Sequence, residues 1–219
     1  MESSPFDLKT YLQSKQQQMN DRLLRSLPPA ASSRIADAMC YSVMAGGKRL
    51  RPVLCLAAAE AVGGCTHDAI NTAVAIELIH TYSLIHDDLP AMDDDVLRRG
   101  KPTCHMAYGE ATAILAGDAL LTLAFQLLAS QEGEVDVPAD RRLQVIHAVA
   151  TAAGYEGMIG GQMADIDSEG SRIDLSRLEQ LHLMKTGALI NAAITIGGIL
   201  GGLASLSGAL PTIWLSMRP

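Results

Sequence analysis

Residues 86–103 read HDDLPAMDDDVLRRGKPT, and this stretch decides how the rest of the chain is interpreted. It places five carboxylates within nine residues: Asp87, Asp88, Asp93, Asp94 and Asp95. Like charges this close repel one another, so the cluster favours a cation between them. Mg²⁺ typically bridges one or two carboxylates to substrate phosphates. Arg98 and Arg99 follow directly. Carboxylates for a metal beside fixed guanidinium groups suit diphosphate binding better than the alternative, a solvated acidic loop.

The sequence around this stretch has a helical pattern nearly throughout. Helices are expected at 34–45, at 51–62, from Thr66 to the first aspartates, at 110–130, at about 140–164 and at 176–200. Thr66 is expected to cap the third of these, and Ser176 with Glu179 forms the S-x-x-E pattern that opens the last. The connection from Glu132 to Asp140 is acidic. No convincing period-two strand, repeat or composition break appears, so we predict a single all-α domain.

Composition limits the classes of partner. A chain of 219 residues with 48% hydrophobic residues can form one domain with a substantial core. The net charge is −7 and the basic residues form no run, which argues against nucleic acid. The cysteines are scattered without a CxxC or Cys/His cluster, so neither zinc nor a disulfide framework is expected.

Two terminal segments bear on localisation. The N-terminus has no apolar core behind a basic start, so a signal peptide is not expected and the cytoplasm is the predicted compartment. Residues 186–217 carry no charge and are long enough to cross a bilayer. They are rich in Gly and Ala and contain Ser205, Ser207 and Pro211. A buried core helix followed by an irregular tail is favoured over a membrane span, so no stable membrane insertion is expected.

Further polar positions gain meaning mainly from their neighbours. The segment GGKRLRP at 46–52 is not a nucleotide-binding P-loop, because Ser42 and Arg49 stand where that motif needs Gly and Ser or Thr. Its cations suit a highly charged anion, although a basic helix start is the alternative. His80 lies seven residues before Asp87, on the same helix face, and is either a core histidine or part of the site.

Four motifs, in order and spacing, resemble the trans-isoprenyl diphosphate synthases. They are HDDLPAMDDDVLRRGKPT in the DD-x4-D form of bacterial farnesyl and plant-type geranylgeranyl diphosphate synthases, GGKRLRP, GGQMAD at 160–165, and Lys185-Thr186 in HLMKTGALI. The resemblance covers about residues 8–202. It implies an all-α bundle around a central cavity, with a partial synthase domain over 1–202 and a divergent tail over 203–219.

The resemblance also implies roles for individual residues. Asp87, Asp88 and Asp93 match the Mg²⁺ ligands, and Arg98 matches the arginine that contacts the allylic diphosphate. The isopentenyl diphosphate pocket is matched by Lys48, Arg51, His80 and Arg99. The surroundings of the departing diphosphate are matched by Gln162, Asp165, Lys185 and Thr186. The implied catalytic set is Asp87, Asp88, Asp93, Arg98 and Lys185.

The implied reaction is head-to-tail prenyl transfer. Mg²⁺ and cationic side chains stabilise the departing diphosphate, the alkene of isopentenyl diphosphate attacks the allylic cation, and water is excluded. Tyr82 and Ser83, five and four residues before Asp87, match the chain-length positions. An aromatic residue there favours farnesyl over geranylgeranyl diphosphate, although Tyr82 could simply pack between helices.

The chain departs from the family pattern towards its end. A second aspartate-rich motif is expected downstream of Lys185, but the last aspartate is Asp174, and the sequence after Gly202 no longer matches. We therefore expect a truncated or frameshifted end, with weak or absent turnover. The alternatives are a non-catalytic subunit of a partner synthase and a terpene cyclase, which would not need the isopentenyl pocket. A homodimer is implied by the resemblance alone.

Overall fold

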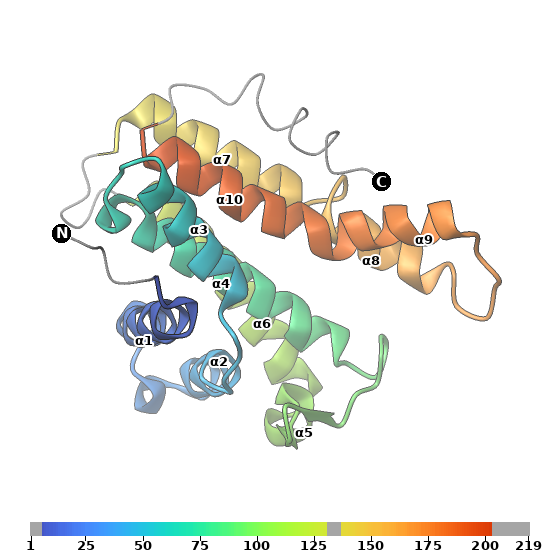
Figure 1. Cartoon of the computed structure of the whole chain (residues 1–219). Coiled ribbons are helices and arrows are strands. Elements are labelled where there is room, and N and C mark those ends of the chain that lie inside the picture. Colours follow the sequence, from blue (N-terminus) through green and yellow to red (C-terminus); the bar gives the residue numbers. More distant parts are fainter. Residues whose placement is uncertain (1–5, 131–136, 203–219) are drawn as a thin grey trace.

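The computed structural model describes residues 6–130 and 137–202, and the predicted tail at 203–219 lies outside them. The described part is almost entirely helical (Figure 1). Its helices are α1 (Leu8–Ser26), η1 (Ala30–Ser32), α2 (Arg34–Val43), α3 (Leu50–Ala61), α4 (Thr66–Asp87), α5 (Cys104–Tyr108), α6 (Glu110–Ala129), α7 (Ala139–Ala153), α8 (Met158–Ile166), α9 (Leu175–His182), η2 (Leu183–Gly187) and α10 (Ala188–Leu200). Two short strands, β1 (Leu97–Arg98) and β2 (Lys101–Pro102), form an antiparallel hairpin.

Helix α4 is the central element of the bundle. It packs against α1, α3, α6 and α10, with α1 and α2 on one side of α3 and α4 and the pair α7 and α10 on the other (Figure 1). The run from Ala73 to Ile79 is buried on every face, as expected for a helix surrounded by others. The helix ends at Asp87, so the acidic motif begins where the buried element reaches the surface.

Glycines in α10 and at its C-terminal cap let this helix pack closely against α3. A Cβ at Gly197 would overlap the carbonyl of Cys55, and one at Gly201 would lie 2.6 Å from the carbonyl of Ala59. Two helices in the described ranges, Glu110–Ala129 and Leu175–Leu200, are long and apolar enough to span a bilayer by length and composition alone. α6 and α10 pack against neighbouring helices of the bundle, whereas α9, the first part of Leu175–Leu200, packs mainly against α8 and η2. The packing of α10 agrees with the expected core helix at the start of the uncharged segment.

Several predicted helix ends differ from the structure. Thr66 is the first residue of α4 rather than its cap, since Cys65 takes that place without a side-chain bond. Ser176 lies within α9, and the cap is Asp174, whose carboxylate accepts a 2.8 Å hydrogen bond from the Arg177 backbone N–H. The helix expected at 140–164 is two helices, α7 and α8. Gly154 leaves the helical conformation, and Gly157 approaches the Ala152 carbonyl too closely for a Cβ.

Candidate active site

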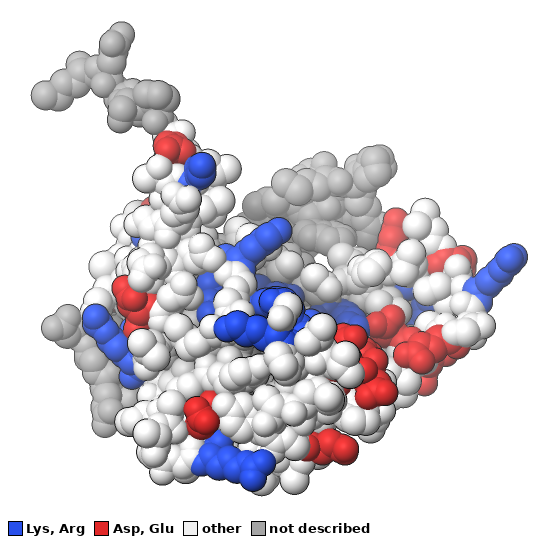
Figure 2. Space-filling model, turned by 90° about the horizontal axis from the view of Figure 1, so that it is seen from below, with Lys and Arg blue, Asp and Glu red and all other residues white. Residues whose placement is uncertain are grey.

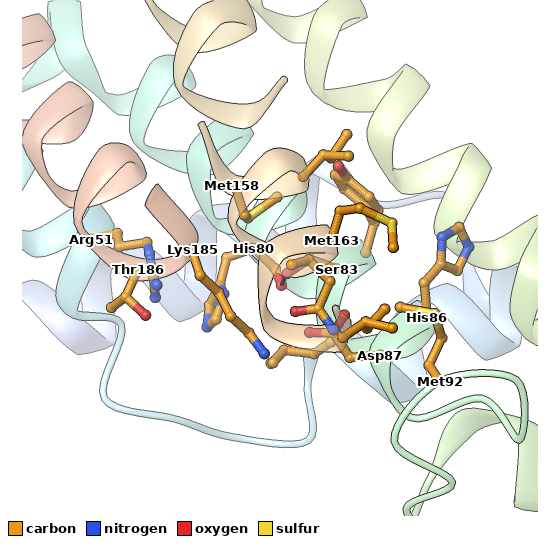
Figure 3. A pocket seen from close by; sticks show the side chains of 15 residues that line it. Arg51, His80, Ser83, His86, Asp87, Met92, Met158, Met163, Lys185 and Thr186 are labelled. Atoms are coloured by element: carbon orange, nitrogen blue, oxygen red, sulfur yellow. Dashed lines mark hydrogen bonds between the residues drawn. The ribbon is translucent and has the colours of Figure 1, made fainter. Parts of the chain in front are cut away.

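A cavity of about 450 Å³ lies at the end of α4, between it, α8 and η2 (Figure 3). Its lining brings together residues of all four sequence motifs: Arg51, His80, Tyr82, Ser83, Leu84, His86, Asp87, Met92, Met158, Ile159, Gln162, Met163, Ile166, Lys185 and Thr186. Figure 3 shows a polar end with Arg51, Lys185 and Thr186, whereas Met92 and Met163 lie at the other end beside His86. The cavity can therefore hold a molecule with a charged head and an apolar body.

Asp87 is the carboxylate at the polar end. Burial raises the pKa of its carboxyl to about 6; nearby Lys185 opposes this and the charge of Asp93 adds to it. The Asp93 backbone N–H donates a 2.9 Å hydrogen bond to the Asp87 carbonyl, which turns the acidic loop back towards the helix end. Two neighbouring carboxylates, one of them desolvated, fit a hard divalent cation.

The protein itself offers few ligands for such a cation. No group of three or more His, Cys, Asp or Glu side chains that could hold a metal ion occurs in the described ranges. Mg²⁺ suits this arrangement because it commonly binds through one or two carboxylates and completes its shell with water and substrate phosphates. The carboxylates present therefore fit a divalent metal that binds together with a diphosphate.

Asp88 points away from this cavity. Its side chain is 4% exposed, and both of its oxygens accept hydrogen bonds from Arg98 Nε, at 2.8 and 2.9 Å. Successive residues near a helix end project in directions about 100° apart, and here Asp87 lines the cavity whereas Asp88 faces Arg98. The geometry does not support the metal-ligand role predicted for Asp88; it instead fixes the guanidinium of Arg98.

A second cavity of about 440 Å³ adjoins the first and is strongly cationic. It is lined by Gly47, Lys48, Arg49, Leu50, Arg51, Glu77, His80 and Arg99, so it contains every residue predicted for the isopentenyl diphosphate pocket. Figure 2 shows Lys and Arg side chains gathered at the middle of this face, with Asp and Glu beside them. Arg51 and His80 line both cavities and form the wall between them.

The shared wall is prepared for an anion. Burial, together with the charges of Arg51, Arg99, Arg98 and Arg49, lowers the pKa of His80 to about 3, so its imidazole is neutral at physiological pH. The Nε of Arg51 and both amide atoms of Gln162 are buried without a hydrogen-bond partner in the described part of the chain. Buried unpaired polar atoms are costly, and Arg51 and Gln162 both line the first cavity, so a polar ligand there would offer hydrogen-bond partners.

Lys185 and Thr186 reach the cavity from an irregular turn. η2 is a π-helix, a rare form that often occurs at functional sites. Lys185 Nζ donates a 2.6 Å hydrogen bond to Asp165 of α8, so the predicted polar neighbour is its ion-pair partner. Gly161 permits this approach, because a Cβ there would overlap the backbone of Lys185.

Sequence reasoning missed two parts of the site. The apolar lining of the first cavity includes Met92, Met158 and Met163, which had no distinguishing pattern. The buried ion pair between Arg49 and Glu77 was also missed, although a carboxylate within the apolar run of α4 was an available signal. Tyr82, predicted to set chain length, is 6% exposed and lines the first cavity, with its ring 5.8 Å from that of His86.

A family model described as polyprenyl synthetase matches residues 32–213. The chain belongs to the polyprenyl synthetase family. This confirms the family that the four motifs predicted.

Curated relatives in this family carry two product names. A geranylgeranyl diphosphate synthase of Cyanophora paradoxa is 50% identical over 198 residues, covering 90% of this chain and 65% of the relative. A farnesyl diphosphate synthase of Bacillus subtilis is 52% identical over 166 residues, covering 76% of this chain and 56% of the relative. The chain thus spans less than two thirds of the length of these polyprenyl synthetase relatives.

Solved structures of the family share the fold. The structure of an FPP/GFPP synthase from Zymomonas mobilis matches with a TM-score of 0.82 at 42% identity, covering 89% of this chain and 70% of that chain. A putative farnesyl-diphosphate synthase from Marinomonas sp. MED121 gives the same TM-score and identity, covering 92% and 72%. The predicted all-α class is confirmed. The chain matches 70% and 72% of the length of these two polyprenyl synthetase structures.

Proposed function

We propose that this chain forms the substrate-binding half of a short-chain prenyl diphosphate synthase, which joins an allylic diphosphate to isopentenyl diphosphate. The observation that carries the proposal is the pair of adjoining cavities that share Arg51 and His80. One combines a desolvated carboxylate, a lysine and an apolar end, and the other is lined by cations. Two diphosphate substrates, one with a prenyl tail, need two such spaces.

Each side chain then has a role in the first cavity. Asp87 and Asp93 would hold Mg²⁺, which neutralises the allylic diphosphate when bound. Lys185 and Thr186 reach the same polar end from η2 and would stabilise the departing diphosphate. Gln162 offers its unpaired amide. Arg98, held by Asp88 on the hairpin, does not line the first cavity and would have to reach the allylic diphosphate from outside it.

The second cavity would bind isopentenyl diphosphate. Lys48, Arg51 and Arg99 supply positive charge, and neutral His80 supplies a hydrogen-bonding group between the two substrates. The apolar wall of Met92, Met158 and Met163 would exclude water from the allylic cation. A terpene cyclase has no second diphosphate substrate, so this cavity also supports a synthase over a cyclase.

For the product we propose farnesyl diphosphate. Tyr82 is a bulky buried side chain in the wall of the first cavity, where it would limit the length of the prenyl tail. Geranylgeranyl diphosphate is the alternative, since relatives of similar identity bear that name.

A second candidate function is that of a non-catalytic subunit that binds diphosphates and pairs with a complete synthase. The observation that favours pairing with another synthase chain is one relative of 48% identity, named as the large subunit of a heterodimeric geranylgeranyl pyrophosphate synthase of Arabidopsis thaliana. If the chain is itself a synthase, we propose that it pairs with a second copy of itself as a homodimer.

A turnover assay separates these functions. The purified chain is incubated with Mg²⁺, geranyl diphosphate and labelled isopentenyl diphosphate, and the extracted products are sized by chromatography. Asp87→Asn is the test variant, and Asp140→Asn, an exposed carboxylate on α7, is the matched control.

A farnesyl product that is lost in Asp87→Asn and kept in the control supports the synthase. Substrate binding without product supports the subunit. A folded chain that binds neither diphosphate contradicts both.

A further inference from the structure

The cationic cavity has a buried ion pair at its base. Arg49 Nη1 lies 2.9 Å from Glu77 Oε1, and the two side chains are only 2% and 3% exposed. Charges are removed from water at high cost unless they are paired and hydrogen-bonded. Neither residue has a role in the proposed chemistry, so their burial calls for an explanation.

Arg49 is held by three elements in a conformation that does not suit an arginine. Besides Glu77 of α4, it donates from Nε to Asn20 of α1 at 2.9 Å and from Nη2 to the Val43 carbonyl of α2 at 2.7 Å. Its φ is 50°, in the left-handed region. Such backbone strain persists only where the surroundings determine the conformation, and it clusters at functional sites.

The strained residue lies between two groups of the cavity. Lys48 precedes it and Arg51 follows two residues later, so the direction of Arg49 into the core decides where these two side chains project. Gln16 donates a 2.6 Å hydrogen bond to the Gly47 carbonyl of the same turn.

Arg99 docks on this turn from the other side. Its guanidinium donates to the Gly46 carbonyl, and a Cβ at Gly47 would lie 2.5 Å from Arg99 Nη1. Arg99 also has a left-handed backbone, with φ 53°. The turn is therefore fixed from inside by Arg49 and contacted from outside by Arg99.

Among the described residues that line this cavity, Glu77 is the one carboxylate. Burial lowers the pKa of the Arg51 and Arg99 guanidinium groups, and the charge of Glu77 opposes that shift in both. Glu77 thus stabilises a set of like charges that would repel one another in the empty cavity.

We propose that Arg49 and Glu77 are positioning residues for isopentenyl diphosphate. Their ion pair fixes the turn that carries Lys48, Arg51 and the docking site of Arg99, without contact to the substrate. The inference rests on the proposed function of this cavity and adds to it two residues that the motif comparison did not assign.

The test is the double variant Arg49→Met, Glu77→Leu in the full chain. Replacing both members avoids an unpaired buried charge, a change that is often neutral for stability. Titration calorimetry measures the affinity for isopentenyl diphosphate and, separately, for geranyl diphosphate with Mg²⁺. Thermal unfolding checks the fold, and amide hydrogen exchange of residues 44–51 reports on the turn. Lys15→Met, which breaks the ion pair with Glu60 outside the cavity, is the control.

The expected result is selective. Isopentenyl diphosphate affinity falls about tenfold or more in the double variant, exchange of the turn accelerates, and geranyl diphosphate affinity changes by less than about twofold. Arg49→Lys, which keeps the charge but loses the planar fork, is expected to lie between wild type and double variant. A purely structural pair would leave both affinities unchanged in a folded variant.

Two results overturn the inference and differ from each other. A folded double variant that keeps the wild-type affinity for isopentenyl diphosphate contradicts the positioning role and leaves the proposed function intact. A folded wild-type chain without affinity for isopentenyl diphosphate contradicts the proposed function and, with it, this inference. If the double variant does not fold, Glu77→Gln and Arg49→Lys decide the question. In each, the change in affinity for isopentenyl diphosphate is compared with the change in affinity for geranyl diphosphate.

Discussion

Arg98 grips the carboxylate of Asp88, with its Nε 2.8 Å from Oδ1 and 2.9 Å from Oδ2. Neighbouring Asp87 has no such partner among the residues that the structure describes, and its side chain lines the cavity instead. The two adjacent aspartates therefore have different roles: Asp88 holds the Arg98 guanidinium, and the Asp87 carboxylate stays available for a ligand.

Substitution should separate these two roles. We expect Asp88→Asn to lower the free energy of unfolding by about 2 kcal/mol, because it weakens charge-assisted hydrogen bonds. It should weaken geranyl diphosphate binding without changing the Mg²⁺ concentration needed for half-maximal binding. Urea unfolding and calorimetry at several Mg²⁺ concentrations measure both. An Asp88→Asn chain that needs much more Mg²⁺ would show that Asp88 is a metal ligand after all.

Asp87 should oppose folding when no cation is present. The pKa of its carboxyl is raised from 3.8 to about 6, so its stabilising contribution exists below the lower value and is lost as pH rises through the higher one. Asp87→Asn should therefore raise the unfolding midpoint at pH 8 in EDTA. The same variant should lose the stabilisation that Mg²⁺ with geranyl diphosphate gives the wild type.

The matched control for this experiment is Asp140→Asn in the first turn of α7, which should not raise the unfolding midpoint in EDTA and should keep the stabilisation by Mg²⁺ with geranyl diphosphate. An Asp87→Asn chain that is destabilised in EDTA would contradict the prediction that burying the charged Asp87 carboxylate lowers the free energy of unfolding.

His80 should make the fold sensitive to acid. Its pKa is lowered from 6.5 to about 3, so the unfolded chain takes up a proton that the folded chain refuses. The contribution is present above pH 6.5 and is lost as pH falls towards 3. Between pH 7 and pH 5 the loss should be about 1–2 kcal/mol.

His80→Gln should remove this loss, whereas exposed His147→Gln should not. Urea unfolding at both pH values measures the difference. Because Asp87 changes stability in the opposite direction over part of this range, the comparison is best made in the Asp87→Asn background. Equal acid sensitivity of the two histidine variants would contradict a buried neutral His80.

Tyr82 should limit the length of the product. Replacement by Ala removes a buried ring from the cavity wall, so longer products should increase relative to C15 in the chromatographic assay. The cavity also costs stability, about 3–5 kcal/mol for a buried aromatic residue. Tyr108→Ala, on α5 away from the cavity, controls for loss of a tyrosine. An unchanged product distribution would mean that Tyr82 serves packing only.

The sequence allowed much of the fold and the site to be predicted. Helix α4 could be recognised because apolar residues on several sides require a surrounded helix, and the acidic cluster at its end indicated a cation. The family motifs then indicated which distant residues would meet, and the structure places Arg51, His80 and Lys185 in one cavity.

What could not be predicted depends on tertiary packing. The inward turn of Arg49 requires partners from three helices, none of which is marked in the local sequence. The direction of Asp88 depends on where α4 ends and on the hairpin that returns Arg98 to it. The break at Gly154 could not be predicted because the apolar pattern is the same for one continuous helix and for two helices, α7 and α8.

The π-helical turn η2 determines how α9 and α10, which follow one another along the chain, are rotated about their helix axis. A π-helix accommodates a residue beyond the regular repeat, so α9 and α10 are rotated relative to a continuous α-helix. That rotation lets Lys185 face the cleft while Leu189, Ala193 and Ile196 of α10 keep their buried face. Deletion of Met184 would restore regular geometry and turn one half by about 100°. The shortened chain could then keep either the packing of α10 in the core or the direction of Lys185 into the cavity, but not both, although every functional side chain is still present.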